Sequence, residues 1–203
     1  MAKLMNELPI PSQRKGPNQD FLGGQLLVAM PSMNDPRFER SVIFMCSHSP
    51  KGAMGLIVNK PATHITFPEL LVQLSIDHPQ QDQEIPINMG GPVEPGRGFV
   101  LHTSEDFVSD STLRVTPEIS LTATIDVLRA IAAGKGPRNA LLALGYAGWG
   151  PGQLETEILA NGWLHCSVDE ELLYNTDLDS KWLRAIHKIG ISPHLLSGQA
   201  GHA

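Results

Sequence analysis

A glycine-rich segment at residues 90–98, GGPVEPGRG, is the first stretch whose residue types could bind a ligand. Such turns can place several backbone N–H groups around an anion, and Arg97 could add a positive charge. The segment lacks the Lys-Ser/Thr pair of a P-loop, and it lacks a G-x-G-x-x-G pattern that leads into a helix. Pro92 and Pro95 also remove two N–H donors. The pattern favours a rigid turn that feeds a strand at Gly98, and an anion site at Gly90 and Gly91 stays the alternative.

A second candidate is the segment at residues 145–155, GYAGWGPGQLE, which combines two aromatic rings with several glycines. We expect it to join a buried strand to the first turn of a helix, where free N–H groups and the positive end of the helix dipole lie. Tyr146 and Trp149 could stack against a ligand or peptide, while Gln153 and Glu155 fall in the first helical turn. The same composition also fits two rings that fill the core edge beside a tight glycine turn. Both interpretations stay open.

The third candidate is a polar loop at residues 32–40, SMNDPRFER. Asn34 and Asp35 are residue types that form Asx turns. An ion pair from Asp35 to Arg37 or Arg40 would fix the loop locally. Alternatively, Arg40 would meet an anion at the rim of a pocket.

The cysteines and histidines give a weaker pattern. Cys46 and His48 would share one face of a strand, whereas His165 and Cys166 would point to opposite faces, because side chains alternate along a strand. A Cys₂His₂ zinc site would therefore need a broken strand, and the C-x₂-C spacing is absent. A Cys-His nucleophile lacks a visible orienting group. We predict no metal site, no cofactor and no assigned catalytic residue, and we expect His102 to be a satisfied residue at the core edge.

Short apolar runs separated by turn residues predict the elements that position these segments. Strands are expected at residues 24–29, 41–47, 53–59, 85–88, 98–103, 112–115, 119–121, 139–146 and 163–168. Helices are expected at residues 66–74, 124–133, 151–161 and 179–189, with a helical turn at 169–173. Strand pairs that follow each other along the chain indicate antiparallel pairing, so the predicted fold class is α+β.

Three of these helices have further predicted features, namely a capping box in one and an apolar stripe in each of the other two. Thr66 and Glu69 have the spacing of a capping box. The predicted apolar stripes consist of Leu154, Ile158 and Leu159 in one helix, and of Trp182, Leu183, Ile186 and Ile189 in another.

The composition limits the class of protein. The chain has 203 residues, of which 41% are hydrophobic, and this length and composition indicate one globular domain with a packed core. Its formal net charge is -6. We expect a flexible N-terminal arm at residues 1–20, a single domain at 21–190 and a flexible tail at 191–203. No apolar run is long enough for a signal peptide or a membrane span, and the two cysteines are far apart, so we expect a cytoplasmic protein without membrane contact.

Three strings, at residues 24–61, 88–103 and 142–164, together resemble the YqgE/AlgH family. The most specific parts are GAMGLIVNKP, which contains Asn59, and GYAGWGPGQLE. The resemblance implies a bacterial cytoplasmic protein with a bifurcated, mostly antiparallel, partly barrel-like sheet surrounded by helices. It implies no established enzyme activity, and one branch of the family carries the label of a transcriptional regulator of alginate production.

Three hypotheses follow for the function. The first is a binding or regulatory module for an unknown small ligand or protein partner. The second is an enzyme of unassigned class that uses a polar pocket around Arg97, His102 and Glu155, although the sequence favours a non-enzymatic role. The third, direct nucleic-acid binding, is not expected because the chain is acidic and has no basic helix. The oligomeric state stays open. The candidate binding residues are Asn34, Asp35, Arg40, Asn59, Gly90, Gly91, Arg97, His102, Tyr146, Trp149, Gln153 and Glu155.

Overall fold

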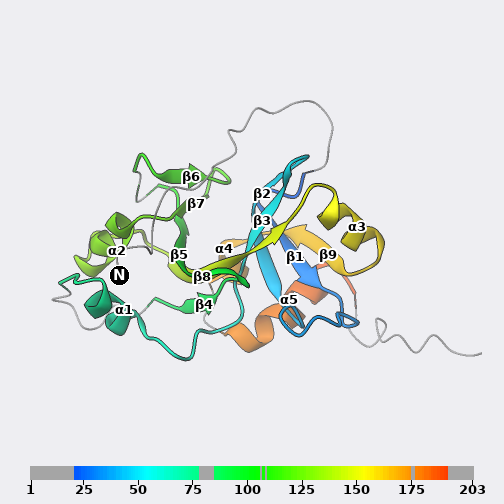
Figure 1. Ribbon diagram of the computed structural model, residues 1–203, viewed down its shortest axis with the longest axis horizontal. Helices are drawn as coiled ribbons and strands as arrows, with labels where there is room; N and C mark the ends of the chain where they lie inside the picture. The colour runs from blue at the N-terminus through cyan, green and yellow to red at the C-terminus, as the bar shows by residue number, and fades with distance from the viewer. Residues whose placement is uncertain (1–20, 78–84, 106, 108, 175–176, 192–203) are drawn as a thin grey trace, which may run out of the picture.

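The computed structural model of the chain describes residues 21–77, 85–105, 107, 109–174 and 177–191 (Figure 1). The arm predicted at residues 1–20, and the predicted tail beyond Ile191, lie outside these residues. Within them, no helix is long and apolar enough to cross a membrane.

The described residues form nine strands and five helices. The strands are β1 (Gln25–Ala29), β2 (Val42–Ser49), β3 (Gly52–Ile57), β4 (Ile87–Met89), β5 (Val93–Thr103), β6 (Thr112–Arg114), β7 (Ile119–Thr122), β8 (Ala140–Trp149) and β9 (Trp163–Ser167). The helices are α1 (Phe67–Gln73), α2 (Ile125–Ala132), α3 (Gln153–Leu159), α4 (Glu170–Tyr174) and α5 (Leu178–Lys188). Each element expected from the sequence therefore has a counterpart.

One strongly curled sheet runs in the order β6-β7-β5-β8-β3-β2-β1-β9, with β4 added at β8. Neighbouring strands are antiparallel except for β4 and β8. The sheet forks at β8. One edge of β8 pairs with β5, while the other edge pairs first with β4 and then, from Ala147 to Trp149, with β3. The expected α+β fold with a bifurcated, mostly antiparallel, partly barrel-like sheet is confirmed.

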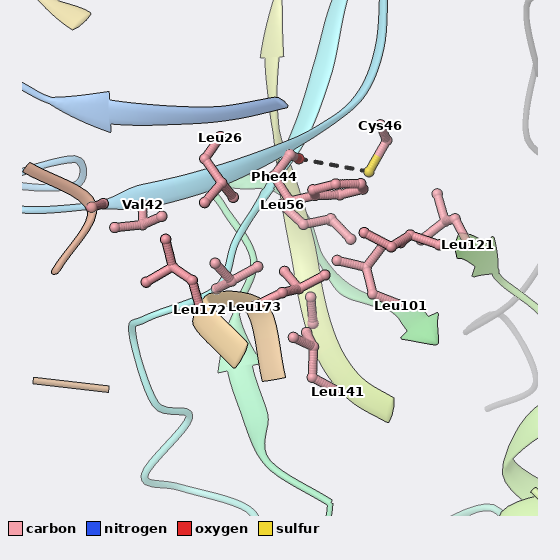
Figure 2. Packing of buried hydrophobic residues seen from close by; sticks show 14 of the residues in the cluster. Leu26, Val42, Phe44, Cys46, Leu56, Leu101, Leu121, Leu141, Leu172 and Leu173 are labelled. Atoms are coloured by element: carbon pink, nitrogen blue, oxygen red, sulfur yellow. Dashed lines mark hydrogen bonds between the residues drawn. The ribbon is translucent and has the colours of Figure 1, made fainter. Parts of the chain in front are cut away.

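Three apolar clusters pack against the two faces of this curled sheet. The inner cluster takes side chains from strands of both halves and from α4 and α5, so it fills the inside of the curl. Figure 2 shows its strand residues Phe44, Leu101 and Leu141 facing Leu172 and Leu173 of α4. The left outer cluster packs α1 and α2 against β5 and β8, and the right outer cluster packs α3 against β1, β2 and β3 (Figure 1).

Close backbone contact between Gly90–Gly91 and β8 makes the fork possible; we call Gly90, Gly91 and Gly145 the glycine crossing. The Gly90 N–H donates to Leu144 O at 2.7 Å, and the Gly90 carbonyl accepts from Ile57 N at 2.9 Å. A Cβ atom on Gly91 would collide with the Tyr146 backbone, and one on Gly145 would lie 2.5 Å from Gly91 O. Only glycine fits at such an approach.

Gly145 also changes which way the β8 side chains point. It adopts φ 70°, which is the left-handed region. Before it, Ala143 faces the inner cluster and Leu144 the left outer one; after it, Tyr146 faces the inner cluster and Ala147 the right outer one. The alternation thus shifts by one residue, as at a β-bulge. One strand can therefore serve both halves of the molecule.

Two strand boundaries differ from the sequence prediction by three residues or more. β8 continues to Trp149, because Ala147, Gly148 and Trp149 pair with β3. β5 begins at Val93 and not at Gly98, because Val93 already pairs with Tyr146. The expected turn is instead an excursion inside β5.

The helix details are confirmed in part. The capping box of Thr66 and Glu69 is present. The prediction that Leu159 and Leu183 are core residues is wrong, because Leu159 is 84% exposed and Leu183 is also exposed. On α5 Lys181 is buried, although Leu183 is not, and Lys181 is only 1% exposed.

Lys181 is buried without a carboxylate partner among the described residues. Its Nζ donates to Val58 O at 3.0 Å and to Leu173 O at 2.7 Å, so it ties α4 and α5 to the end of β3. Burial disfavours the charged amine and lowers its pKa to about 8.

We expect Gly145→Ala to destabilise the fold by about 3 kcal/mol or more, because the new methyl group meets the backbone of Gly91 and Val93. The control is Gly152→Ala, which has nearly the same φ, 72°, but nothing within 4 Å of its Cβ position. It should cost about 1 kcal/mol, the penalty for left-handed φ alone. Urea unfolding of the wild type and the two variants measures both values. Equal losses of unfolding free energy would contradict the inference that Cβ collisions exclude other residues from the glycine crossing.

The pH dependence of stability should report Lys181. Its folded pKa of about 8 lies below the ordinary value of 10.5, so the unfolded chain binds more protons between these pH values and stability rises with pH there. Relative to Lys181→Met, the wild-type protein should gain about 2–3 kcal/mol between pH 8 and 10. The other titrating groups cancel in this difference. Parallel curves of unfolding free energy against pH would show that burial does not lower the pKa of Lys181.

Candidate functional site

An excursion in β5 brings together two predicted site residues, Arg97 and Tyr146. Val93 pairs with Tyr146 and Gly98 with Leu144, so residues 94–97 loop out opposite Gly145 alone. Glu94 takes φ 47°, which is strained for a residue with a side chain. Strain of this kind persists where the surrounding structure enforces it, and here the glycine crossing does so.

Arg97 is held in place by a carboxylate and an aromatic ring. Its Nη1 lies 3.0 Å from Glu94 Oε2, and its Cζ lies 5.3 Å from the centre of the Phe99 ring. Phe99 in turn meets the Tyr146 ring edge to face at 5.9 Å. We call Glu94, Arg97, Phe99 and Tyr146 the bulge site. The Arg97 side chain is 13% exposed and that of Glu94 is 50% exposed, so the charge pair lies at the rim of the inner cluster.

Tyr146 and Trp149 do not form one stacking surface. Tyr146 packs on the inner cluster, whereas Trp149 belongs to the right outer cluster, because residues three apart on a strand point to opposite faces. Of the two interpretations left open by the sequence, core filling describes Trp149. Gly90 and Gly91 are both buried, and the Gly90 N–H is already bonded to β8, so their role in the structure is to bring the backbones close.

The polar loop at residues 32–40 is closed by local contacts. Asp35 Oδ1 accepts from Arg37 N at 3.0 Å, which is the expected Asx turn, and the Arg37 guanidinium pairs with the same carboxylate at 2.6 Å. The hydrogen bond from Arg37 lowers the pKa of Asp35. Asn34 is exposed at the start of the loop.

Asn59 and Arg40 close the other end of that loop. Asn59 Oδ1 accepts from Val42 N at 2.7 Å, and its Nδ2 donates to Arg40 O at 2.9 Å. Arg40 has φ 50°, and its guanidinium lies 5.7 Å from the Trp182 ring. Both residues therefore join the loop to β2 and α5, away from the bulge site.

Two further predicted residues lie at the start of α3. The Glu155 carboxylate accepts from His48 Nε2 at 3.0 Å, while His48 Nδ1 accepts from Leu22 N at 3.1 Å. Gln153 bridges Gly150 N and the carboxylate of Glu157. Glu155 has a lowered pKa, mainly because its own backbone N–H donates to its carboxylate, with a smaller contribution from His48.

Glu157 is a residue that the sequence reasoning missed. Its Oε2 accepts from the indole N–H of Trp149 at 2.9 Å and from that of Trp163 at 2.8 Å. The sequence contained a signal, since Glu157 falls three residues after Leu154, on the apolar stripe of α3. A carboxylate on such a stripe needs polar partners.

Cys46 and His48 do not share a face, and that prediction was wrong. The pairing of β2 with β3 shifts between Met45 and Ser47, so His48 lies opposite Ala53 of the right outer cluster while Cys46 belongs to the inner one. Burial raises the pKa of the Cys46 thiol, which keeps it protonated and unreactive. Within the described residues, no three His, Cys, Asp or Glu side chains are grouped as a metal site would require.

His102 lies on β5 far from the bulge site and is fully buried. Its Nδ1 lies 2.9 Å from Thr103 O, and its Nε2 lies 2.9 Å from Thr122 Oγ1. Arg97, His102 and Glu155 thus each have a different partner. No acid–base pair forms among these three side chains, although the enzyme alternative around them requires one.

Comparisons with known proteins agree with this architecture. A family model described as AlgH-like matches residues 26–194. A UPF0301 protein of Rhodopseudomonas palustris (strain HaA2) is 59% identical over 191 residues, which is 91% of this chain and 88% of the relative. The solution structure of the AlgH protein from Pseudomonas aeruginosa is similar with 41% identity and a TM-score of 0.73, covering 95% of this chain and 100% of that one. A crystal structure from Corynebacterium diphtheriae shares the fold at 21% identity and a TM-score of 0.67, covering 92% and 94%.

We expect Glu157→Ala to destabilise the protein by about 2–4 kcal/mol, because two buried indole N–H groups lose their acceptor. The matched control is Glu171→Ala, which removes an exposed carboxylate that pairs with Arg184 and should cost less than about 1 kcal/mol. Urea unfolding followed by circular dichroism gives both values. If the two variants were equally stable, Glu157 would not anchor α3.

Proposed function

Since the chain belongs to the AlgH-like family, we propose that it is a cytoplasmic binding or regulatory module that recognises an anionic group of a small ligand or protein partner at the bulge site. The observation that carries the proposal is the Arg97–Glu94 pair at the rim of the inner cluster. A guanidinium that is 13% exposed and stacked on a ring is positioned before any ligand arrives. Such preorganisation lowers the cost of binding.

The chemistry of the pair suggests the kind of ligand. An Arg guanidinium binds carboxylate and phosphate groups through parallel N–H donors, and Glu94 already supplies a carboxylate from the chain itself. Because half of the Glu94 side chain is exposed, it can turn outward and leave Arg97 to an incoming anion. The Tyr146 ring packs against Phe99, the ring on which Arg97 stacks.

A regulatory role of the kind that the family resemblance implies would then act through this ligand or partner. Direct contact with DNA is not part of the proposal, because the chain has a net charge of -6. The enzyme alternative around Arg97, His102 and Glu155 is not favoured, because the three side chains have separate partners.

We expect inorganic phosphate or succinate to raise the melting midpoint of the wild-type protein in proportion to ligand occupancy. Arg97→Ala should weaken binding by about tenfold or more, and Glu94→Gln should tighten it several-fold, because the internal competitor loses its charge. The matched control is Arg129→Ala, which removes an exposed ion pair of the same three-residue spacing on α2 and should leave binding unchanged. Titration calorimetry checks the affinities.

Two outcomes would contradict this function. One is the absence of any anion-dependent shift in the wild-type protein. The other is equal affinity in the wild type, Arg97→Ala and Glu94→Gln, each shown to be folded by circular dichroism.

A further inference from the structure

A continuous row of side-chain hydroxyl groups leads from a half-buried serine to the buried His102. Ser109 Oγ lies 3.1 Å from Thr112 Oγ1, Thr112 Oγ1 lies 2.8 Å from Thr122 Oγ1, and Thr122 Oγ1 lies 2.9 Å from His102 Nε2. We call Ser109, Thr112 and Thr122 the hydroxyl row. Ser109 and Thr112 are partly exposed, whereas Thr122 and His102 are fully buried. The row therefore connects the surface with an imidazole.

Three neighbouring strands create this row. β5 pairs with β7 so that His102 lies opposite Ser120, and β7 pairs with β6 so that Thr122 lies opposite Thr112. Leu121, between Ser120 and Thr122, faces the inner cluster, so both polar neighbours face the outside of the curl. The alternation of a strand places these side chains on the same face as His102.

The hydrogens of the row have one consistent direction. Since the carbonyl of Thr103 can only accept, the N–H of a neutral His102 ring is on Nδ1, and Nε2 accepts from the Thr122 hydroxyl. Thr122 then has no hydrogen left for Thr112 and accepts from it. Thr112 accepts in turn from Ser109, whose backbone N–H points at the same oxygen at 3.2 Å. Each hydroxyl therefore donates toward His102.

This arrangement has the parts of an activated nucleophile. A hydroxyl bonded to an imidazole, with the second ring nitrogen oriented by an acceptor, is the pattern that makes serine reactive in acyl transfer. Here the hydroxyl beside His102 is buried, so a substrate can meet only the outer end of the row. The reacting oxygen would be that of Ser109, two hydroxyls away from the base.

We propose that Ser109 is a nucleophile toward carboxylic esters and that the hydroxyl row carries its proton to His102. The Ser109 oxygen forms a bond to the acyl carbon while its proton moves to Thr112, the Thr112 proton to Thr122, and the Thr122 proton to His102 Nε2. The bond from the acyl carbon to the alkoxy oxygen breaks, and the alcohol leaves with the proton returned along the row. Water then releases the acid from the Ser109 ester. The site is separate from the bulge site and does not depend on the proposed anion binding.

A row with a purely structural role makes a different prediction. Hydroxyls that only satisfy one another on a buried sheet face, as Ser104 and Ser120 do at 2.8 Å, gain no reactivity. Removal of one of them would then change stability and nothing else.

The test is labelling of the full chain with a fluorophosphonate probe, in which the serine oxygen replaces fluoride on phosphorus. Mass spectrometry should find the label on Ser109, and Ser109→Ala should abolish it. Thr122→Val keeps the shape but breaks the row, and it should slow labelling by about tenfold or more, while Thr122→Ser should retain it. The wild-type rate should follow one ionisation with pH that Thr122→Val loses.

Ser180→Ala serves as the matched control, because Ser180 is a serine of α5 whose Oγ bonds Asp177 and not the row. It should label like the wild type. The proposal is overturned if the wild type is not labelled, if the label lies on another residue, or if folded Thr122→Val reacts as fast as the wild type. None of these results affects the phosphate titration of the bulge site, so the two proposals fail separately.

Discussion

The close approach of the glycine crossing to β8 is the constraint on which the rest of the structure depends. Four strands meet there, because Gly90 directly follows β4 and bonds both Leu144 of β8 and Ile57 at the end of β3, while β5 lies along the opposite edge of β8. Any Cβ at Gly90, Gly91 or Gly145 would enter the space of a neighbouring backbone. The fork of the sheet is therefore a backbone feature, and apolar packing on both sides follows from it.

The same crossing shapes the bulge site. Between the pairs Val93–Tyr146 and Gly98–Leu144, β8 has one residue, Gly145, whereas β5 has four. Residues 94–97 therefore cannot pair with β8 and bulge out of the sheet. The excursion puts Glu94 in a strained conformation and brings its carboxylate to Arg97. Most other polar side chains in the interior have a fixed structural partner: Lys181 holds two carbonyls, and Glu157 holds two indoles. Arg97 differs, because Glu94, the carboxylate that pairs with it, is half exposed.

The sequence predicted the local structure well wherever the cause is local. The capping box of Thr66 and Glu69, the Asx turn at Asp35 and the strand pairs joined by short turns depend on residues a few positions apart. The family resemblance predicted the bifurcated sheet. The candidate site could be predicted only in part. Arg97 and Tyr146 come together through Phe99, but Asn59 and Arg40 close a loop elsewhere, and Trp149 lies on the other face of the sheet.

The sequence by itself determined which segments are strands and helices and most of the turns between them, but it predicted a turn before Gly98 where β5 has already begun at Val93. Only the tertiary structure decided which faces the side chains take, because two bulges, at Gly145 and between Met45 and Ser47, each shift the alternation by one residue. The shift between Met45 and Ser47 separated Cys46 from His48, and the shift at Gly145 decided that Tyr146 faces the inner cluster and Trp149 the right outer one. The two changes in alternation could not be predicted from residue spacing, because the position of a bulge depends on how the strand pairs with its partner.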